Sequence, residues 1–319
     1  MGRRPSCAID GYVLRTHTSY NANDVVSFAL VGSLLLGVVL LFVASRVPSH
    51  TRYMRAVLIG SGLTCILLPV IAMVIRPIRV IHIASSLISR SVKTPPFLSR
   101  AKYFPRSREL ERPAFVARVQ HELRNMLART RNGTDVRFTR DTFGGENQEI
   151  GVDVSGERGW RTYVVKIGDD VTTHAQRDFP TLVRALRTMP EVRACVVSML
   201  DGKTHIPAHV GYFKGTMRYM LALQVPQRHP ERCYLCVNGM RYQWREGVGV
   251  LWDDTFPHRV MNGTDERRIV LYMDVLRPLQ SSTLKWIRDA ATTLFVSSPT
   301  VKAEIQRTER REALTTTPV

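Results

Sequence analysis

Two long apolar runs near the start of the chain restrict its fold more than any other feature. Residues 25–45 contain no charged side chain and are bounded by Asp24 and Arg46, and residues 56–75 form a second uncharged run. A helix of about 20 apolar residues spans the hydrocarbon core of a bilayer. Pro69 in the second run is compatible with such a helix, because neighbouring helices can satisfy the freed carbonyl group. The two runs therefore predict a transmembrane helical hairpin.

A cleaved signal peptide is the alternative interpretation of the first run. The run is longer than the apolar part of a signal peptide, it starts late, and it lacks a convincing small-residue cleavage site. We therefore interpret both runs as membrane spans, preceded by an N-terminal tail at residues 1–24.

The distribution of Lys and Arg predicts on which side of the membrane the ends of the hairpin lie. The connector at residues 46–55 carries three basic residues, the tail at 1–24 carries three, and residues 76–106 carry seven. Because a hairpin places both of its ends on one side, these counts predict a two-span integral membrane protein whose main domain faces the cytosol. The segment directly after the second run has an apolar face and basic ends, so it either lies along the lipid headgroups or continues the helix.

The remainder of the chain predicts one folded domain between two less regular segments. We expect a basic juxtamembrane segment and linker at residues 76–104, the folded domain at 105–280, and a C-terminal helix and disordered tail at 281–319. Apolar residues at helical spacing predict an entry helix from Pro113, and an early proline predicts a second helix near residues 179–189.

The second half of this domain has the sequence pattern of a β protein. After Pro190, six short runs rich in Val, Leu, Tyr and Cys fall within about ninety residues and are separated by turn residues. No helical segment interrupts them, which predicts an antiparallel sandwich or barrel. The polar, Gly-bearing residues 131–149 before it predict a loop.

The charge balance indicates an anionic partner. The chain has 45 Lys and Arg against 27 Asp and Glu, a net charge of +18. Because the hairpin already holds the domain at a membrane, anionic lipid headgroups are favoured over nucleic acid as that partner. The five cysteines are too few for a small disulfide-stapled secreted domain. Cys233 and Cys236 would face opposite sides of a strand and have no second pair, which favours packing over a zinc site.

Two of the nine histidines stand out by their position. His209 and His258 each lie where a predicted strand ends, and a small β-barrel can bring two such residues to one mouth. Neutral imidazole is a ligand for Fe, Zn and Cu. On their own the two histidines leave both a metal site and an ordinary structural role open.

The sequence around both histidines resembles one known family. The motifs that carry the resemblance lie between Ser198 and Pro278 and read DGKTHIPAHVG, FKGTMRYMLAL and WDDTFPHRVMNGTDERRIVLYMDV. They resemble the aspartyl/asparaginyl β-hydroxylases, a family of Fe(II)- and 2-oxoglutarate-dependent oxygenases, over roughly residues 105–280. Together with GWRTYVVKI, LRTMPEVRACVVSML and the apolar N-terminus, they are most similar to the membrane-anchored hydroxylases of lipid A acyl chains. The segment DGKTHIPAHVG fits the aspartyl/asparaginyl hydroxylases about equally well.

The resemblance implies a fold and a set of site residues. The fold would be a double-stranded β-helix, a jelly-roll of the cupin-like kind with flanking helices. His209 and His258 would be the iron ligands, and Arg268 would pair with the far carboxylate of 2-oxoglutarate through its planar guanidinium. Ser198 would help to hold that carboxylate, and Arg218 would lie near the end of the cosubstrate closest to the iron. No catalytic residue is implied beyond these ligands of Fe(II) and 2-oxoglutarate, which act together with O2.

Two residues depart from the pattern of the family. Most non-haem iron sites use two histidines and one carboxylate, but Gly211 occupies the carboxylate position here. The lipid hydroxylases typically carry Asp there, whereas the animal aspartyl/asparaginyl hydroxylases carry Gly and remain active. Met220 stands where family members usually have a histidine close to the cosubstrate. We expect weaker iron binding and an altered contact with the near carboxylate of 2-oxoglutarate.

These features predict a membrane-anchored dioxygenase that hydroxylates an unactivated C–H bond of a lipid acyl chain or of a side chain in a membrane-associated protein. The alternatives are a peptidyl aspartyl/asparaginyl β-hydroxylase and an inactive binding protein on the same fold. Asn132 and Asn262 begin Asn-Gly-Thr sequons, which are glycosylated only in a secretory lumen. A glycan on Asn262, four residues after His258, would crowd the site, which favours the cytosolic topology.

Overall fold

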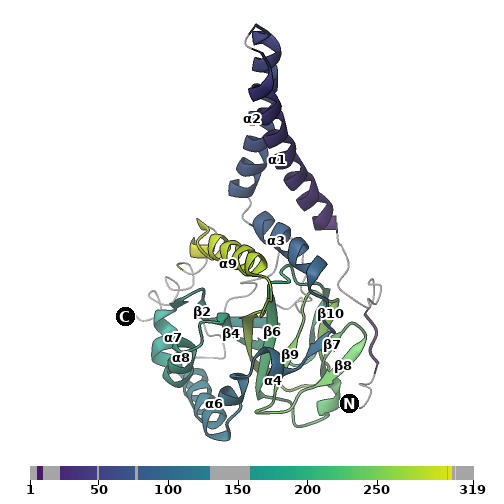
Figure 1. Cartoon of the computed structure of the whole chain (residues 1–319). Coiled ribbons are helices and arrows are strands. Elements are labelled where there is room, and N and C mark those ends of the chain that lie inside the picture. Colours follow the sequence, from purple (N-terminus) through teal and green to yellow (C-terminus); the bar gives the residue numbers. More distant parts are fainter. Residues whose placement is uncertain are drawn as a thin grey trace. The chain divides into compact units, whose positions relative to one another are not determined.

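The computed structural model of the chain describes residues 6–9, 22–48, 50–75, 78–129, 159–299, 301–303 and 306. They form two compact units, one of Ser19–Val92 and Gln280–Ser298, and one of Met1–Thr18, Lys93–Leu279 and Pro299–Val319. We call them the helical unit and the β domain (Figure 1). The predicted loop at 131–149 and almost all of the predicted disordered tail lie outside the described residues.

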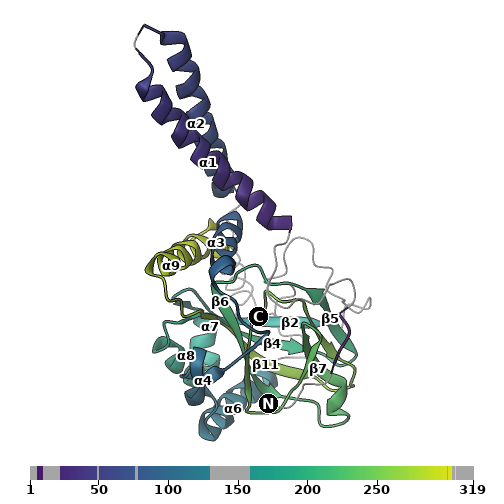
Figure 2. The same ribbon diagram turned by 45° about the vertical axis from the view of Figure 1, so that its right-hand side comes forward.

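The helical unit contains two long helices that lie side by side, as Figures 1 and 2 show. They are α1 (Ala22–Arg46) and α2 (Arg52–Ile75), and both begin a few residues earlier than predicted. Glycines set their closest approach, since a Cβ atom on Gly37 would lie 2.8 Å from the Gly62 carbonyl oxygen. The unit also contains α3 (Ile78–Ser91) and α9 (Ser282–Val296), which pack on each other. The predicted C-terminal helix is therefore confirmed as α9.

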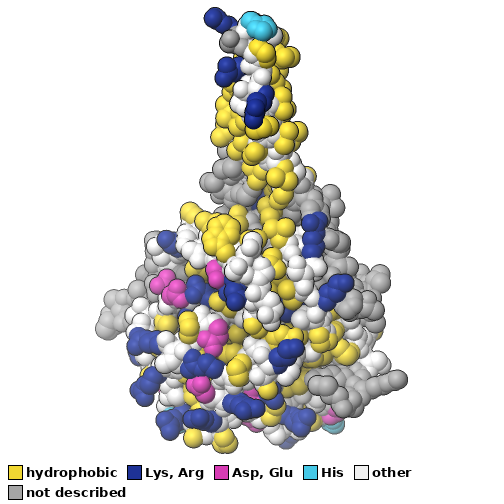
Figure 3. Space-filling view, viewed as in Figure 1, with side chains coloured by type: hydrophobic (Ala, Val, Ile, Leu, Met, Phe, Trp, Pro, Cys, Tyr) yellow, Lys and Arg dark blue, Asp and Glu magenta, His cyan; other side chains and the backbone are white. Residues whose placement is uncertain are grey.

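One membrane-spanning candidate is found among the described residues. The segment Ala29–Arg46 of α1 is long and apolar enough to cross a bilayer, and Figure 3 shows apolar side chains along the visible face of the two helices. Leu35, Val38 and Phe42 are each at least 60% exposed, which favours a lipid environment over a protein core. The second predicted span, residues 56–75, falls within α2 and stays a prediction, because side chains at the end of α2 lie outside the described part.

The β domain is built from two antiparallel sheets. The large sheet has the strand order β1-β9-β6-β11-β4-β2-β3, and the small sheet has the order β5-β10-β7-β8. The strands are β1 (Phe97–Leu98), β2 (Trp160–Ile167), β3 (Asp170–Val171), β4 (Val192–Leu200), β5 (Thr204–His209), β6 (Thr216–Gln224), β7 (Cys233–Val237), β8 (Met240–Gln243), β9 (Gly249–Trp252), β10 (His258–Asn262) and β11 (Arg268–Leu276). From β4 to β11 the chain alternates between the sheets, apart from the hairpin β7–β8. This alternation is the topology of a double-stranded β-helix, as expected.

Strand residues alternate between two apolar cores. Side chains such as Leu200, Val270 and Trp252 point between the two sheets and form the interior core. Their neighbours Met199 and Leu271 point to the opposite face of the large sheet and pack against helices. The helices of the β domain are α4 (Arg100–Tyr103), α5 (Ser107–Leu110), α6 (Pro113–Ala128), α7 (Thr173–Asp178) and α8 (Pro180–Arg187). The predicted entry helix is confirmed as α6, and the helix predicted near residues 179–189 is confirmed as α8.

Two segments that were expected to be irregular belong to the β domain. Residues 94–105 were predicted to be linker, but β1 lies within them and pairs with β9 in the register Phe97↔Trp252. Residues 6–9 of the predicted tail lie against the hairpin β7–β8, where Cys7 forms a disulfide with Cys236. The packing role expected for the cysteines of CYLC therefore applies to Cys233, which is buried and free, and not to Cys236.

A buried ion cluster joins four segments of the β domain. Asp253 Oδ2 accepts hydrogen bonds from Lys214 Nζ, Arg277 Nη2 and Thr94 Oγ1. Its other oxygen accepts from the backbone N–H and the hydroxyl of Thr255. Lys214, Asp253 and Arg277 are at most 1% exposed. The first of the two adjacent aspartates therefore acts in the fold, and it holds the turn that leads to His258.

Candidate active site

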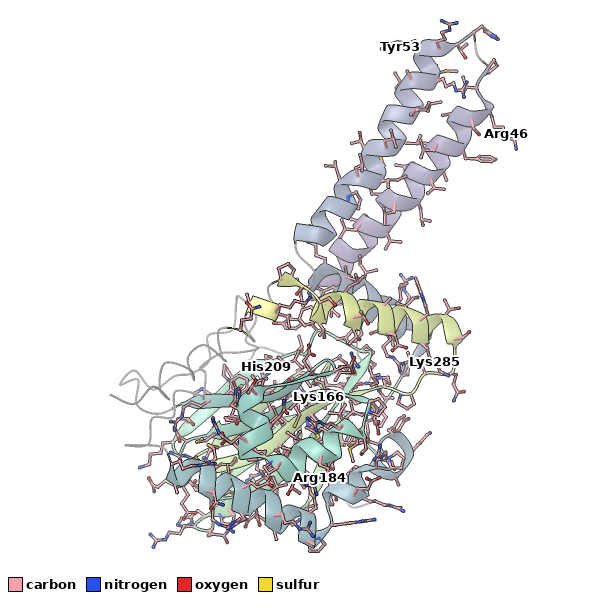
Figure 4. The ribbon with its side chains drawn as sticks, turned by 90° about the vertical axis from the view of Figure 1, so that its left-hand side faces the viewer. Arg46, Tyr53, Lys166, Arg184, His209 and Lys285 are labelled. Carbon is pink, nitrogen blue, oxygen red and sulfur yellow. A yellow bond between two sulfur atoms is a disulfide. The ribbon has the colours of Figure 1, made fainter. Side chains whose placement is uncertain are left out.

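The two histidines singled out by the sequence lie next to each other. His209 is the last residue of β5, His258 is the first residue of β10, and the two are paired in the antiparallel register of these strands. Their ring centroids are 4.0 Å apart. His258 is buried, while His209 is partly exposed and is labelled in Figure 4. The expectation that distant strands bring both imidazoles together is met. No third His, Cys, Asp or Glu of the described residues completes a metal-binding cluster with them.

Backbone carbonyl groups fix the orientation of both imidazoles. His209 Nδ1 lies 2.8 Å from the Pro207 oxygen, and His258 Nδ1 lies 2.8 Å from the Phe256 oxygen. Because a carbonyl oxygen only accepts, each Nδ1 carries the proton and each Nε2 keeps its lone pair. Burial lowers the pKa of His209 to about 4 and the pKa of His258 well below its usual value. Both rings are therefore neutral at pH 7 and suited to bind a metal through Nε2.

Asp254 fills the space beside Gly211, the residue that departs from the usual carboxylate. A Cβ atom built on Gly211 would lie 2.3 Å from Asp254 Oδ2, and the Gly211 N–H donates to the Asp254 carbonyl oxygen at 2.7 Å. Asp254 Oδ1 is buried and has no hydrogen-bond partner among the described residues. Burial, opposed by the charge of Arg218, raises the pKa of Asp254 to about 6. Gly211 is thus the residue that leaves room for this carboxylate.

Substituting Gly211 with alanine is expected to destabilise the β domain. The new methyl group meets Asp254 at a distance that atoms do not adopt, and overpacking of this kind costs about 1–3 kcal/mol. The measurement is the thermal unfolding of the metal-free full-length chain. Gly263→Ala is the matched control, because its Cβ atom meets neighbours only at 3.5 Å or more. Adding Asp254→Ala should remove most of the cost, and an equal cost in both backgrounds would contradict this account of Gly211.

Arg268 is a buried charge without a counterion among the described residues. It is 0% exposed, and none of its three guanidinium nitrogens has a hydrogen-bond partner among the described residues. The guanidinium carbon lies 5.4 Å from the centre of the Trp244 ring, and burial lowers the pKa of Arg268 to about 10. Arg268 lies two residues before Val270 on β11, and residues two apart on a strand share a face. Arg268 therefore points, like Val270, into the interior between the sheets. An unpaired buried charge is costly, so this position fits an incoming carboxylate, which a guanidinium binds through two parallel hydrogen bonds.

Ser198 and Met220 also face the interior between the sheets. Ser198 lies opposite Val270 in the pairing of β4 with β11, and its Oγ accepts a hydrogen bond of 2.9 Å from Trp160 Nε1. The hydroxyl proton of Ser198 is thereby directed away from Trp160. Met220 is 6% exposed and belongs to the interior core. The structure therefore places an apolar thioether where the family usually has a histidine.

Arg218 lies beside Asp254 and is fully engaged by acidic neighbours. Its guanidinium forms ion pairs with Asp254 at 2.8 Å and with Asp274 at 2.9 Å. It also lies 3.9 Å from the centre of the Tyr272 ring. Two carboxylates balance its charge, in contrast to Arg268. The contact of Arg218 with a cosubstrate stays a prediction.

Sequence reasoning did not single out the tryptophans of the site. Trp252 packs the edge of its ring on His258, with centroids 4.6 Å apart. Trp244 lies under Arg268, and its Nε1 is buried without a partner among the described residues. The alternation of β9 places Trp252 on the same face as the interior residue Val250, so strand periodicity contained a signal for Trp252. Trp244 comes directly after the end of β8 at Gln243, so strand periodicity gave no signal for it.

Comparisons with known proteins find relatives that match the β domain. Residues 116–278 match the family model for aspartyl/asparaginyl beta-hydroxylase. An ornithine lipid ester-linked acyl 2-hydroxylase from Rhizobium tropici is 28% identical over 159 residues, which cover 49% of this chain and 56% of that protein. An aspartyl/asparaginyl beta-hydroxylase from Homo sapiens is 28% identical over 111 residues, which cover 33% of this chain and 14% of that protein. The matched part thus spans about half of the first relative and a small part of the second.

Solved structures with similar folds are more distant. A prolyl-4-hydroxylase from Pseudomonas putida has a TM-score of 0.33 and 14% identity, over 53% of this chain and 89% of that one. An oxidoreductase of the 2OG-Fe(II) oxygenase family from Burkholderia pseudomallei has a TM-score of 0.30 and 12% identity, over 40% of this chain and 73% of that one. The family model, in contrast, covers about half of the chain and includes both histidines and Arg268. The chain therefore belongs to the aspartyl/asparaginyl beta-hydroxylase family.

Proposed function

We propose that this protein is a membrane-anchored, Fe(II)- and 2-oxoglutarate-dependent hydroxylase of lipid acyl chains. The proposal rests on the side chains that lie in the interior between the two sheets. This interior holds two neutral imidazoles whose Nδ1 atoms are bound to backbone carbonyl groups, and one buried guanidinium without a partner among the described residues. This set of groups matches what an iron ion and a dicarboxylate need.

Each residue has a separate task in this proposal. His209 and His258 hold the iron through Nε2, and Arg268 binds the far carboxylate of 2-oxoglutarate, with the Ser198 hydroxyl beside it. When bound, the iron and the cosubstrate supply the oxidation, in which 2-oxoglutarate and O2 become succinate and CO2 and one oxygen atom enters a C–H bond. Trp252 and the surrounding apolar side chains keep water away from the histidines. Asp254 and Arg218 line the side where a third protein ligand is missing.

Three observations favour a lipid as the substrate. The relative from Rhizobium tropici is named as an acyl hydroxylase of ornithine lipid. The helical unit contains an exposed apolar helix that is long enough to span a bilayer. The net charge of +18 favours a surface that faces anionic headgroups. The anchor would thus place the domain where acyl chains are concentrated.

The test is product formation by the full-length chain in lipid nanodiscs. The chain is loaded anaerobically with Fe(II) and 2-oxoglutarate, mixed with a lipid extract and exposed to O2. We expect succinate, together with lipids that gain one oxygen atom by mass spectrometry. His258→Ala should reduce both to the level without enzyme, while His205→Ala, on the exposed side of the same strand as His209, should not. Succinate formation that survives His258→Ala would contradict the proposal.

A second candidate is hydroxylation of Asp or Asn side chains in proteins. Gly211 favours it, because the animal aspartyl/asparaginyl hydroxylases that the sequence resembles also have Gly at this position. Asp- and Asn-containing peptides therefore form a second arm of the same assay. Modified peptide without modified lipid would support this candidate over the first. No succinate with either substrate, together with no binding of Fe(II), would indicate an inactive binding protein.

A further inference from the structure

A disulfide fixes the first described residues of the chain to the β domain. Cys7 and Cys236 are joined across a sequence separation of 229 residues. The Cys7 N–H donates to the Gly239 carbonyl oxygen at 2.9 Å, and Ser6 forms an antiparallel bridge with Met240. Backbone pairing therefore supports the contact between the two segments in addition to the bond between the sulfur atoms.

The two ends of this disulfide lie on opposite sides of the hairpin in the sequence. Cys7 precedes α1, and Cys236 follows α2. Because the two sulfur atoms can bond only in one compartment, the chain must cross the membrane an even number of times between them. If α1 crosses, a second crossing is required. At about 1.5 Å per residue, the 24 residues of α2 are long enough to supply it, whereas the 14 residues of α3 are too short for a bilayer core of about 30 Å.

We propose that α1 and α2 both span the membrane and that the β domain lies on its oxidising, non-cytosolic side. The proposal rests on the membrane anchoring proposed above. Disulfides persist in oxidising compartments, whereas cytosolic thiols are kept reduced. Formation of the bond removes two electrons and two protons from the two thiols. A disulfide-bearing oxidant accepts them by thiol–disulfide exchange and becomes a dithiol.

Part of the count of basic residues that predicted cytosolic ends comes from residues of the folded domain. Arg100 and Arg106, which entered the count for cytosolic ends, belong to the β domain and pair with Glu111 and Glu109. A long domain crosses a membrane largely regardless of its charge, whereas short loops follow the positive-inside rule. The connector at residues 46–55 is such a loop, and its three arginines then face the cytosol.

The sequon at Asn262 no longer argues for a cytosolic domain. Asn262 is 0% exposed, and its amide nitrogen donates to the carbonyl oxygens of Leu200, Asp201 and Glu266. Its side-chain oxygen accepts from Thr264, the other polar residue of the sequon. The folded protein therefore cannot be glycosylated at Asn262 in any compartment.

This orientation determines which lipids the site can reach. The substrate would come from the leaflet that faces the oxidising compartment. The disulfide also gives the β domain a second tether, because the chain between Ile9 and the start of α1 at Ala22 can span at most about 47 Å. Both ends of the hairpin then hold the domain at the same membrane surface.

The first test counts free thiols in the full-length chain in cell membranes. Thiols are trapped with acid, the protein is denatured, and a polymer-linked maleimide adds a fixed mass to each thiol. Of the five cysteines, we expect three to react before reduction and five after it. Cys7→Ser and Cys236→Ser should each give four adducts under both conditions. Cys195→Ser, a buried free cysteine, is the control and should give two adducts before reduction.

The second test reports the side of the membrane independently. In sealed vesicles whose cytosolic face is outward, an impermeant maleimide is applied to Tyr53→Cys and to Arg184→Cys. Tyr53 lies within the connector and is 85% exposed, and Arg184 lies exposed on α8 of the β domain (Figure 4). We expect Tyr53→Cys to react in intact vesicles and Arg184→Cys to react only after they are permeabilised.

The outcomes separate this proposal from the proposed function. Five adducts before reduction, or reaction of Arg184→Cys in intact vesicles, would overturn the oxidising orientation but leave the hydroxylase assay unaffected. Reaction of both variants in intact vesicles would mean that the hairpin does not span, which overturns the membrane anchoring as well. Succinate formation that depends on His258 decides the enzymatic activity regardless of either result.

Discussion

Arg268→Met is expected to lower the affinity for 2-oxoglutarate by about 30-fold or more and, at the same time, to stabilise the chain in the absence of cosubstrate. Loss of one partner of a buried charge pair costs about 2–5 kcal/mol in binding. Without cosubstrate, however, the buried guanidinium of Arg268 has no partner among the described residues, so an apolar side chain removes a cost. Calorimetric titration of 2-oxoglutarate into the anaerobic Fe(II)-loaded chain and thermal unfolding of the unloaded chain measure the two effects.

The neighbouring residue provides the control for Arg268. Arg267 is partly exposed and pairs with Asp201 at 2.8 Å. Arg267→Met removes the same charge without changing the interior, so the affinity for 2-oxoglutarate should stay unchanged. If both variants lost affinity equally, the effect would come from net charge and not from a specific carboxylate site. If Arg268→Met lowered the stability of the unloaded chain, the description of Arg268 as an unpaired charge would be wrong.

Asp253→Asn is expected to lower the free energy of unfolding of the β domain by about 3–5 kcal/mol, because it removes the buried carboxylate charge that accepts hydrogen bonds from both Lys214 and Arg277. For a domain of this size, that loss lowers Tm by about 10 °C. Thermal unfolding of the purified full-length chain is the measurement. Asp169→Asn is the control, since Asp169 is 78% exposed and pairs with Arg193 at the surface, where such pairs contribute little. An unchanged Tm for Asp253→Asn would mean that the cluster does not hold the turn before His258.

The pH dependence of this cluster follows from the pKa of Asp253. Burial alone would raise that pKa, but the charges of Arg277 and Lys214 lower it from 3.8 to about 2. The lowered value means that the unfolded chain binds the proton more tightly. The stabilisation is therefore present above about pH 4 and is lost as the pH falls towards 2. The variant and the wild-type protein should accordingly become similar in Tm only at the acid end of this range.

The elements that sequence predicted well are those with a repeating pattern or a local motif. The strands after Pro190 are short runs rich in Val, Leu, Tyr and Cys between turn residues, and α6 has apolar residues at helical spacing. His209, His258 and Arg268 were identified because they stand in motifs of a family that the chain proves to belong to. Their contacts could then be anticipated from the order of the strands, since a double-stranded β-helix brings the ends of β5 and β10 together.

The features that sequence missed depend on contacts between distant segments. Cys7 and Cys236 are 229 residues apart, and spacing alone does not determine which cysteines pair. The fit of Asp254 against Gly211 depends on the path of two loops, which no periodicity encodes. β1 was taken for linker because a strand of two residues is too short to show alternation. The ion pairs of Arg218 with Asp254 and Asp274 likewise join segments that sequence spacing does not connect.

The disulfide affects whether proteolysis can release the β domain from the membrane. Cys7 and Cys236 close a covalent ring that contains both long helices and the strands from β1 to the end of β7. A single protease cut anywhere inside this ring leaves one linked molecule, so the released fragment of an ordinary anchored enzyme would be absent. Shedding of the β domain from the membrane would need two events, which are either one cut in the chain and reduction of the bond or two cuts that remove the hairpin between them.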